Sequence, residues 1–331
     1  MQRAVWYLMG PTASGKTDLA VELCKRFPFE IVSVDSSMVY RGMDVGTAKP
    51  EAGVLLQCPH HLIDIRAPWE TYSVADFCRD ARSLIEDIIG RRCWPLLVGG
   101  TMFYFRALEQ GLPELPRANS AIRREIEERA SRDGWPSLYR ELVKRDPGRA
   151  ARIEPGDRQR IQRALEIVTL TGVSSVFLQH PAGAGLRDEY PLCKLSLAPA
   201  DRSWLHQRIE TRFQSMLRDG LVEEVRNLLK IKALSPELPA LRMVGYRQVV
   251  QYLKGELEYN GIERRGVAAT RQLAKRQLTW LRNQPGVTWL DCSSQRLVDS
   301  TADYIRAKQA AFGQLFSTKI RTIAPTNSLR T

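Results

Sequence analysis

The sequence lacks any uninterrupted apolar run long enough to cross a membrane, which takes roughly 18 to 20 residues. It also lacks a secretory signal, because the apolar run Val5–Met9 is too short and leads directly into Gly10. The six cysteines are scattered, without a C-x-x-C pair or a histidine at metal-ligand spacing. This favours reduced, mostly buried thiols over disulfides or a metal centre. No internal repeat is present, and we expect a cytoplasmic protein.

The chain has 331 residues, of which 44% are hydrophobic and 26% charged, as in an ordinary globular protein of one or two domains. Lysine and arginine number 49 against 37 acidic residues, which gives a net charge of +12. Excess positive charge favours a polyanionic partner through its long-range field and the release of counterions. On charge alone, however, a nucleic-acid-binding protein and a merely basic one are equally well supported.

Short apolar or β-branched runs in the first 100 residues predict three strands, at Val5–Met9, Glu30–Asp35 and Pro95–Val98. A helical pattern follows the first strand, and a second begins at a capping box that starts at Ser73. Strands that alternate with helices are typical of a parallel sheet with helices on both faces. The sequence therefore predicts an α/β core.

The pattern changes after residue 112, since no convincing strand appears between 113 and 191. Helical patterns there cover 122–130, 137–144 and 158–170, and later ones cover 205–217, 222–229 and 265–281. Strands return at 194–198 and 287–290. We predict a catalytic core of residues 1–112 and 192–312 and an all-helical insertion of residues 113–191 that binds RNA. Residues 313–331, rich in Thr, Ser and Pro, are expected to form a disordered tail.

Residues 10–17, Gly-Pro-Thr-Ala-Ser-Gly-Lys-Thr, satisfy the phosphate-binding pattern G-x-x-x-x-G-K-[ST] between a predicted strand and helix. The glycines let the backbone N–H groups face one anion at the start of the helix. Lys16 supplies a point charge for the terminal phosphate, and the Thr17 hydroxyl is offered to Mg²⁺. The pattern predicts a P-loop NTPase-like sheet that binds a phosphoanhydride. The expected contacts are Gly10, Thr12, Ala13, Ser14, Gly15, Lys16 and Thr17.

Further blocks of sequence resemble the tRNA dimethylallyltransferases, also called tRNA isopentenyltransferases. They are Ile31–Pro50, Pro59–Asp64, Leu97–Tyr104, Asp157–Arg163, Arg242–Arg247 and Thr270–Arg282. The blocks keep the family's order and span about residues 4–291. The P-loop is generic, whereas the blocks around Asp35 and from Lys275 to Arg282 are specific. Many members carry Gln where Met38 stands, so the base contact of that side chain is expected to be weaker or made by the backbone.

The resemblance implies transfer of a dimethylallyl group from dimethylallyl diphosphate to N6 of the adenine just 3′ of the anticodon, position 37. It implies Mg²⁺ as cofactor and the anticodon stem-loop of tRNA as partner, and we expect a monomer without membrane contact. It also implies that Arg212, in a helix where Arg208 lies one turn earlier, contacts the diphosphate. The sequence has no D-D-x-x-D metal clamp for an allylic diphosphate, so the P-loop must replace it.

An exocyclic adenine amine is a poor nucleophile, so transfer requires a general base and strong stabilisation of the leaving diphosphate. Asp35 and Thr101 each follow a predicted strand, at the edge where open α/β sheets place their ligands. We assign Asp35 as the base and Thr101 as a hydrogen-bonding group near the reacting amine or diphosphate. The alternatives are an Asp that only caps a turn and a purely structural Thr.

Basic residues gather in two of the predicted helices. Between residues 265 and 282 there is no acidic residue, and Arg271, Lys275 and Arg282 fall on one helix face, which suits RNA phosphates. Residues 158–163 form a second basic stretch, whose amides suit unpaired bases. A solvated basic face is the alternative. Since N6 of a stacked adenine is poorly accessible, the target base is expected to be flipped out. The predicted tRNA-binding residues are Asp35, Ser36, Ser37, Met38, Arg123, Gln159, Arg160, Ile161, Gln162, Arg163, Arg242, Gly245, Tyr246, Arg247, Arg271, Lys275, Arg276 and Arg282.

Two other functions remain open at this point. A P-loop kinase acting on a small molecule or nucleoside would share the loop, but no predicted strand clearly ends in the metal-holding Asp of a Walker B motif. A non-catalytic RNA-binding module with a relict loop would not need the intact pair Lys16 and Thr17.

Overall fold

The computed structural model describes residues 4–172, 174, 184–231, 233–235 and 238–322, with side chains up to residue 311. It divides into two compact units, the first of residues Met1–Arg106 and Tyr190–Thr331 and the second of Ala107–Glu189. The prediction had placed the corresponding boundaries at 113 and 191.

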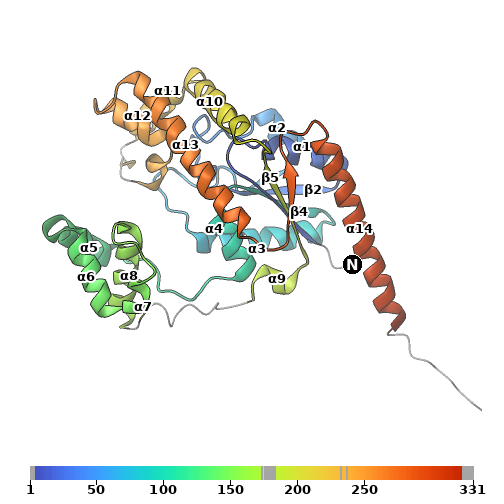
Figure 1. Cartoon of the computed structure of the whole chain (residues 1–331), viewed down its shortest axis with the longest axis horizontal. Helices are drawn as coiled ribbons and strands as arrows, with labels where there is room; N and C mark the ends of the chain where they lie inside the picture. Colours follow the sequence, from blue (N-terminus) through green and yellow to red (C-terminus); the bar gives the residue numbers. More distant parts are fainter. Residues whose placement is uncertain (1–3, 173, 175–183, 232, 236–237, 323–331) are drawn as a thin grey trace, which may run out of the picture. The chain divides into compact units, whose positions relative to one another are not determined.

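A six-stranded parallel sheet forms the centre of the first unit, with the order β3-β2-β4-β1-β5-β6 (Figure 1). The strands are β1 Val5–Met9, β2 Phe29–Val34, β3 His60–His61, β4 Trp94–Gly99, β5 Leu192–Ala198 and β6 Val287–Asp291. Nearly every residue of the central strands is buried, as expected where helices cover both faces of a parallel sheet. The α/β fold and the five predicted strands are confirmed. The two-residue strand β3 carries no recognisable pattern and was missed.

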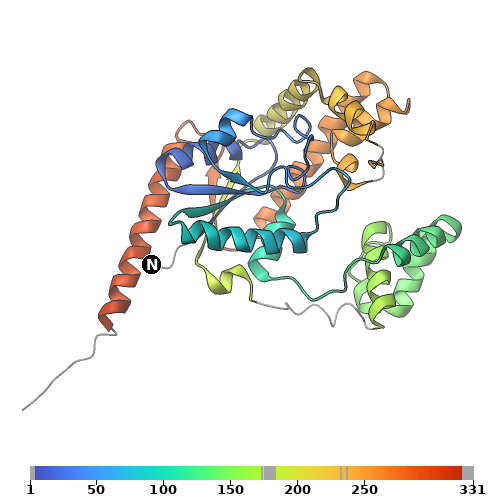
Figure 2. The ribbon, with the colours of Figure 1, turned by 180° about the vertical axis from the view of Figure 1, so that it is seen from behind.

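The helices that contribute to this unit are α1 Lys16–Arg26, α2 Ala52–Gln57, α3 Val74–Gly90, α4 Met102–Gln110, α10 Arg202–Arg218, α11 Leu221–Leu229, α12 Tyr246–Leu253, α13 Tyr259–Arg282 and α14 Leu297–Thr322, with the 3₁₀ turn η1 Pro239–Arg242. Alternate strand residues face opposite sides. Trp6 and Leu8 of β1 join a core with α1 and α14. Tyr7 instead meets Phe105 of α4, with ring centroids 4.9 Å apart. Figure 2 shows α1 and α3 on opposite sides of the strands.

Two local predictions have clear outcomes in this unit. The capping box at Ser73 is present, because the Ser73 hydroxyl accepts the Asp76 N–H while the Asp76 carboxylate accepts the Ser73 N–H. The disordered tail is wrong in its first part, because α14 continues to Thr322 and makes residues 313–322 helical. The remaining tail residues, 323–331, lie outside the described residues.

The second unit contains only helices within its described residues. They are α5 Ser120–Asp133, α6 Trp135–Arg145, α7 Pro147–Ala150, α8 Arg158–Thr171 and α9 Leu186–Glu189. A small apolar core of α5, α6 and α8 includes Ile126, Leu142 and Ile161. Capping defines the element ends: the Asn119 side chain accepts N–H groups at the start of α5, and Gly172 ends α8 with φ +68°.

A buried carboxylate ties this unit together. Glu166 of α8 is fully buried and accepts hydrogen bonds from the Asn119 N–H at 2.6 Å, from Arg123 at 3.1 Å and from Arg163 at 2.6 Å. Burial alone would raise the pKa of Glu166, but these donors outweigh it and hold the pKa below its usual value of 4.5. Two helices and the segment before α5 therefore depend on one charge.

We predict that Glu166→Gln destabilises the second unit by about 3 kcal/mol, because Arg123 and Arg163 lose their buried counter-charge. The contribution of ionised Glu166 should be complete above its usual pKa of 4.5 and should disappear as the pH falls through its lower folded-state pKa. Hydrogen exchange of α5 and α8 in the full chain measures this. Glu125→Gln, at an exposed position of α5, is the matched control. Equal protection of the two variants would contradict the role of Glu166.

Candidate phosphate-binding and transfer site

The residues that follow three neighbouring strands lie at one edge of the sheet. The P-loop follows β1, Asp35 follows β2, and Thr101 lies two residues beyond the end of β4. The Thr101 N–H donates to the Val34 carbonyl at 3.2 Å, and the Thr101 hydroxyl accepts the Ser36 N–H at 3.1 Å. The two predicted catalytic residues are thus held on adjoining chain segments at the carboxyl edge, where parallel sheets place their ligands.

The P-loop curls tightly between β1 and α1. Gly15 adopts φ +82° and Ala13 φ +62°, and the buried Ser14 hydroxyl donates to the Pro11 carbonyl at 2.8 Å. The helix begins at Lys16, so the N–H groups of its first turn are available to an anion at its N-terminus. Lys16 Nζ donates to the Pro11 carbonyl at 2.6 Å. The loop therefore has the conformation and the charge of a phosphate cradle.

Two arginines of α10 bring further positive charge to the loop. Arg208 donates to the Ala13 carbonyl at 2.9 Å and lies over the Trp204 ring, 4.9 Å from its centroid. Arg212 donates to the Thr47 carbonyl at 3.3 Å. The sequence assigned only Arg212 to the diphosphate. The spacing of four residues also placed Arg208 on the same helix face, and this could have predicted that Arg208 lies at the loop.

Crowded positive charge changes how these groups titrate. Burial, followed by the Arg212 charge, lowers the pKa of Lys16 from 10.5 to about 8, although Asp35 opposes this change. Burial also lowers the pKa of Arg212, with Arg208 adding to the effect and Asp35 opposing it. Asp18 also opposes the change at Arg212. Because Asp35 and Asp18 do not balance the three cations, the site favours a multiply charged anion.

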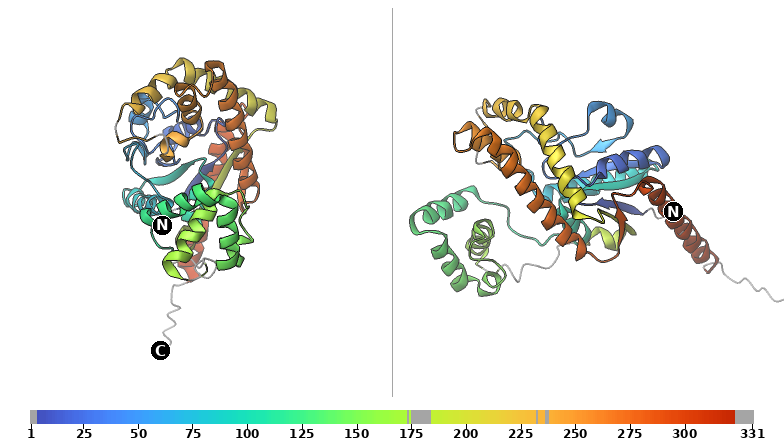
Figure 3. Two further views of the ribbon diagram at one scale, coloured as in Figure 1. Left: turned by 90° about the vertical axis from the view of Figure 1, so that its left-hand side faces the viewer. Right: turned by 45° about the horizontal axis from the view of Figure 1, so that its top comes forward.

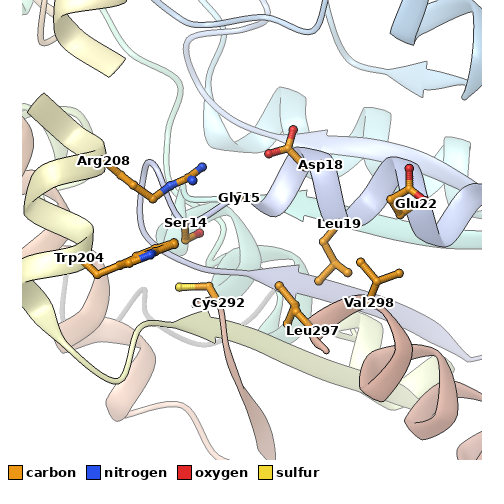
Figure 4. A pocket seen from close by; sticks show the side chains of 10 residues that line it. All are labelled: Ser14, Gly15, Asp18, Leu19, Glu22, Trp204, Arg208, Cys292, Leu297 and Val298. Atoms are coloured by element: carbon orange, nitrogen blue, oxygen red, sulfur yellow. The ribbon is translucent and has the colours of Figure 1, made fainter. Parts of the chain in front are cut away.

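A hollow of about 180 Å³ lies beside the loop (Figure 4). Its walls are Ser14, Gly15, Asp18, Leu19, Glu22, Trp204, Arg208, Cys292, Leu297 and Val298. Figure 4 shows Arg208 and Trp204 along one side, opposite the first turns of α1. Leu19, Leu297 and Val298 make one end apolar, while Asp18 and Glu22 place carboxylates on the α1 side.

The Asp35 carboxylate is oriented through one of its two oxygens. Asp35 Oδ1 accepts the Ser37 N–H at 2.8 Å and the Ser37 hydroxyl at 2.5 Å. Within the described residues, Oδ2 accepts no hydrogen bond from a protein donor. Asp35 therefore does cap a turn, as the alternative interpretation proposed, yet the cap fixes the carboxylate and leaves one oxygen for a proton.

Met38, which stands where many family members carry Gln, is partly buried next to the same turn. Its sulfur lies 3.9 Å from the Ser33 hydroxyl. The Met38 carbonyl accepts the Asp64 N–H at 3.1 Å. A thioether is only a weak hydrogen-bond acceptor, so this side chain cannot replace the two-sided hydrogen bonding of an amide.

The predicted tRNA-binding residues of α13 do not share one environment. Lys275, Arg276 and Arg282 are exposed, and no ion pair of theirs is found in the described part of the chain. Arg271 is half-buried and pairs with Glu210 of α10 at 2.9 Å. Figure 3 shows α10 and α13 side by side, in agreement with their contacts. Of the three cations that the sequence placed on one helix face, Lys275 and Arg282 are exposed, whereas Arg271 is partly neutralised.

In the second unit, Gln159 and Arg160 are exposed at the start of α8, and Arg160 pairs loosely with Asp157 at 3.3 Å. Arg123 and Arg163 are held by Glu166, although 42% and 29% of their side-chain surfaces remain exposed. Gln162 donates to the Glu127 carboxylate at 2.9 Å. Half of this predicted set is thus already engaged within the protein.

Two residues predicted to contact tRNA have fully buried side chains. Ile161 belongs to the apolar core of the second unit. The Tyr246 hydroxyl donates to Glu224 at 2.7 Å, and burial followed by the Glu224 charge raises its pKa. The flanking residues Arg242 and Arg247 are exposed, and Gly245 adopts φ +92° between them.

The carboxylate of Glu224, on α11, was missed by sequence reasoning. It accepts three successive N–H groups, those of Asp44 at 2.8 Å, Val45 at 2.7 Å and Gly46 at 3.1 Å, besides the Tyr246 hydroxyl. A Cβ on Gly46 would lie 2.5 Å from the Tyr246 ring, so only glycine fits there. The loop that presents the Thr47 carbonyl to Arg212 is thereby fixed. No local pattern marks a contact across about 180 residues.

Gln277 of α13 was missed as well. Its Oε1 accepts the Thr12 N–H of the P-loop at 2.9 Å, and its Nε2 donates to the Gly100 carbonyl at 2.9 Å.

The parallel sheet, the loop at its carboxyl edge and the surrounding cations define a P-loop α/β protein whose site suits a phosphoanhydride. Residues 38–284 match the family model described as IPP transferase. A tRNA dimethylallyltransferase of Thiobacillus denitrificans is 55% identical over 307 residues, which cover 92% of this chain and 97% of that protein. One from Legionella pneumophila is 52% identical over 291 residues, which cover 88% and 92%. The chain belongs to the tRNA dimethylallyltransferase family.

Solved structures of the same family share its fold. The tRNA isopentenylpyrophosphate transferase of Bacillus halodurans aligns with a TM-score of 0.70 and 36% identity over 96% of this chain and all of that one. A eukaryotic dimethylallyltransferase acting on tRNA aligns with a TM-score of 0.73 and 25% identity, over 99% of this chain and 82% of that one. The predicted family and fold class are confirmed. Among the described helices, none has the length and apolarity that a membrane crossing requires.

We predict that pyrophosphate binds more weakly as the pH rises above about 8, the lowered pKa of Lys16. A bound anion favours protonated Lys16, so above that pH binding must take up a proton, and affinity falls by up to about tenfold per pH unit. Calorimetric titrations in buffers of different ionisation enthalpy measure the affinity and the proton uptake. The same series with Lys16→Ala measures the contribution of the ligand's own ionisation, so the difference between the two series isolates that of Lys16. Identical pH dependence in both proteins would contradict the role of Lys16.

Proposed function

We propose that this chain transfers a dimethylallyl group from dimethylallyl diphosphate to N6 of adenine 37 in tRNA, with release of diphosphate. The observation that carries the proposal is the placement of an oriented carboxylate, Asp35, at the same sheet edge as a cation-lined P-loop. Prenyl transfer to a weakly nucleophilic amine needs both the loop and the base. A kinase can use the same pair, so the family of the chain separates the two reactions. Membership of the tRNA dimethylallyltransferase family supports the same reaction.

In the proposed reaction, the N6 lone pair forms a bond to C1 of the dimethylallyl group. The C1–O bond breaks, and its electron pair leaves with the diphosphate. The N6 proton passes to Oδ2 of Asp35, while Oδ1 stays hydrogen-bonded to Ser37. The loop amides with Lys16, Arg208 and Arg212 stabilise the charge that develops on the leaving group. Thr101 sits beside this turn and orients it through the Ser36 N–H.

Mg²⁺ fits the residues at the loop, although they supply few ligands. Within the described residues, no group of three or more His, Cys, Asp or Glu side chains is arranged to hold a metal ion. The Thr17 hydroxyl, at the first turn of α1, has no hydrogen-bond partner in the described part of the protein. A Mg²⁺ ion held by Thr17, phosphate oxygens and water would neutralise charge on the leaving diphosphate.

The tRNA acceptor is proposed to contact Lys275, Arg276 and Arg282 with its phosphates, and its anticodon loop is proposed to contact Gln159 and Arg160. These side chains are among the exposed members of the predicted set. A monomer suffices, because one chain supplies both the donor loop and the base. We propose the cytoplasm as the site of the reaction, in keeping with a tRNA substrate.

Incubation with bulk tRNA and either labelled dimethylallyl diphosphate or labelled ATP separates the three candidate functions. The proposal requires label to pass from the prenyl donor into tRNA. Label transferred from ATP would support the kinase, and binding of tRNA without transfer from either donor would support a non-catalytic RNA-binding protein.

We predict that Asp35→Asn lowers the transfer rate by about 10² to 10⁴, the usual cost of losing a general base. Donor and tRNA affinities should stay close to those of the parent, because the amide oxygen of the substituted side chain can still accept the Ser37 N–H. Single-turnover transfer of labelled prenyl donor measures the chemical step. Ser37→Ala, which keeps the carboxylate, should cost far less. Transfer by Asp35→Asn within threefold of the parent would refute the assignment.

The exposed cations of α13 give a separate prediction about RNA. Lys275→Gln combined with Arg282→Gln should flatten the dependence of log K for tRNA on log salt by about 1.5, since each lost phosphate contact removes roughly 0.7 to 0.9. Pyrophosphate affinity should not change. The control pair Arg296→Gln and Arg306→Gln removes the same charge at exposed positions on and next to α14. Equal slopes for the two double variants would leave α13 as a solvated face.

A further inference from the structure

One side chain spans the gap between the donor loop and the strand end that carries Thr101. Gln277 accepts the Thr12 N–H through Oε1 and donates through Nε2 to the Gly100 carbonyl, both at 2.9 Å. Thr12 is the third residue of the P-loop, and Gly100 directly precedes Thr101. The partners are 265 and 177 residues from Gln277 in sequence.

The chemistry of the two partners specifies an amide. A backbone N–H requires an acceptor and a backbone carbonyl requires a donor, and among uncharged side chains of this length Gln supplies both at once. Glu offers no donor at neutral pH, and Met offers neither partner a strong hydrogen bond. The opposite polarities of Thr12 N–H and Gly100 carbonyl also fix which way the amide is turned.

Gly100 is shaped for this contact. A Cβ at that position would lie 2.5 Å from Gln277 Nε2 and 3.4 Å from the Gly10 carbonyl oxygen. The amide end is the mobile partner, so a methyl group at residue 100 would push it away from the Gly100 carbonyl. The second glycine of Gly99-Gly100 thus allows α13 to approach the strand end.

We infer that Gln277 is a positioning residue that holds the P-loop at a fixed distance from the Thr101 segment, so that the diphosphate and the acceptor amine meet in register. This inference rests on the proposed function. Gln277 touches only backbone, so it acts through Thr12 and Gly100. It lies on a different face of α13 from Lys275 and Arg282, which leaves RNA binding to other side chains of the same helix.

The test compares Gln277→Met with Gln272→Met, a matched change at an exposed position of the same helix. Gln277→Met should weaken Mg-pyrophosphate binding by about tenfold, because two backbone groups of the cradle lose their partner. It should also raise KM for the prenyl donor and lower kcat, whereas tRNA affinity should match that of Gln272→Met. A general distortion of α13 would lower tRNA affinity too, and that result would overturn the inference, as would unchanged pyrophosphate binding.

A second comparison covers the case in which Gln277→Met folds poorly. Gly100→Ala should weaken pyrophosphate binding in the parent but much less in a Gln277→Ala background, where no amide remains to be displaced. Equal effects in both backgrounds would contradict the inference. Pyrophosphate binding needs no tRNA chemistry, so the two proposals fail separately. A parent that never prenylates tRNA refutes the proposed function, whereas an active parent with additive variants refutes the role of Gln277.

Discussion

Uncompensated positive charge at the carboxyl edge of the sheet is the constraint on which the site depends. Lys16, Arg208 and Arg212 lie close to one loop. Asp35 offsets part of the charge of Lys16 and Arg212, and Asp18 adds to the offset at Arg212. Burial makes this arrangement unfavourable for the free protein, which is why the pKa of Lys16 falls to about 8. An arriving diphosphate relieves that repulsion. The protein therefore holds electrostatic energy in its free state that favours the charge borne by the leaving group.

Such a cluster requires rigid supports, and the supports come from distant parts of the chain. Glu224 fixes the loop at Gly46 by accepting three N–H groups, and that loop in turn offers the Thr47 carbonyl to Arg212. Lys49 adds a second support, since it is almost fully buried between the Tyr40 carbonyl, at 2.6 Å, and two carboxylates. Loss of a contact that supports this loop would therefore shift the Arg212 guanidinium, and not only increase the mobility of the loop.

Sequence patterns predicted those features that depend on neighbours along the chain. The strands were found from apolar runs, and the P-loop from a motif that requires a particular backbone. Helix α4 was missed for two reasons. Gly99-Gly100 was interpreted as the end of a strand and no helix was expected after it. The first turns of α4 also carry Phe103 and two more aromatic residues, which have low helix propensity. Helix α14 was not predicted, and the composition near its end was interpreted as a disordered tail. Gln277 was missed because its two partners lie 177 and 265 residues away in the sequence. Glu224 was missed because its partners in the loop lie about 180 residues away.

Charge pattern has the same limitation within a single helix. Residues 265–282 of α13 contain no acidic residue, which suggested one basic surface, yet Glu210 of α10 neutralises Arg271 from outside the helix. The uncharged Gln277, which the pattern ignored, faces the donor loop. A helix of 24 residues has enough length to serve RNA along one face and the catalytic edge along another. Under the proposed function, this one rigid helix would link the positions of the RNA phosphates and of the diphosphate without any direct contact between them.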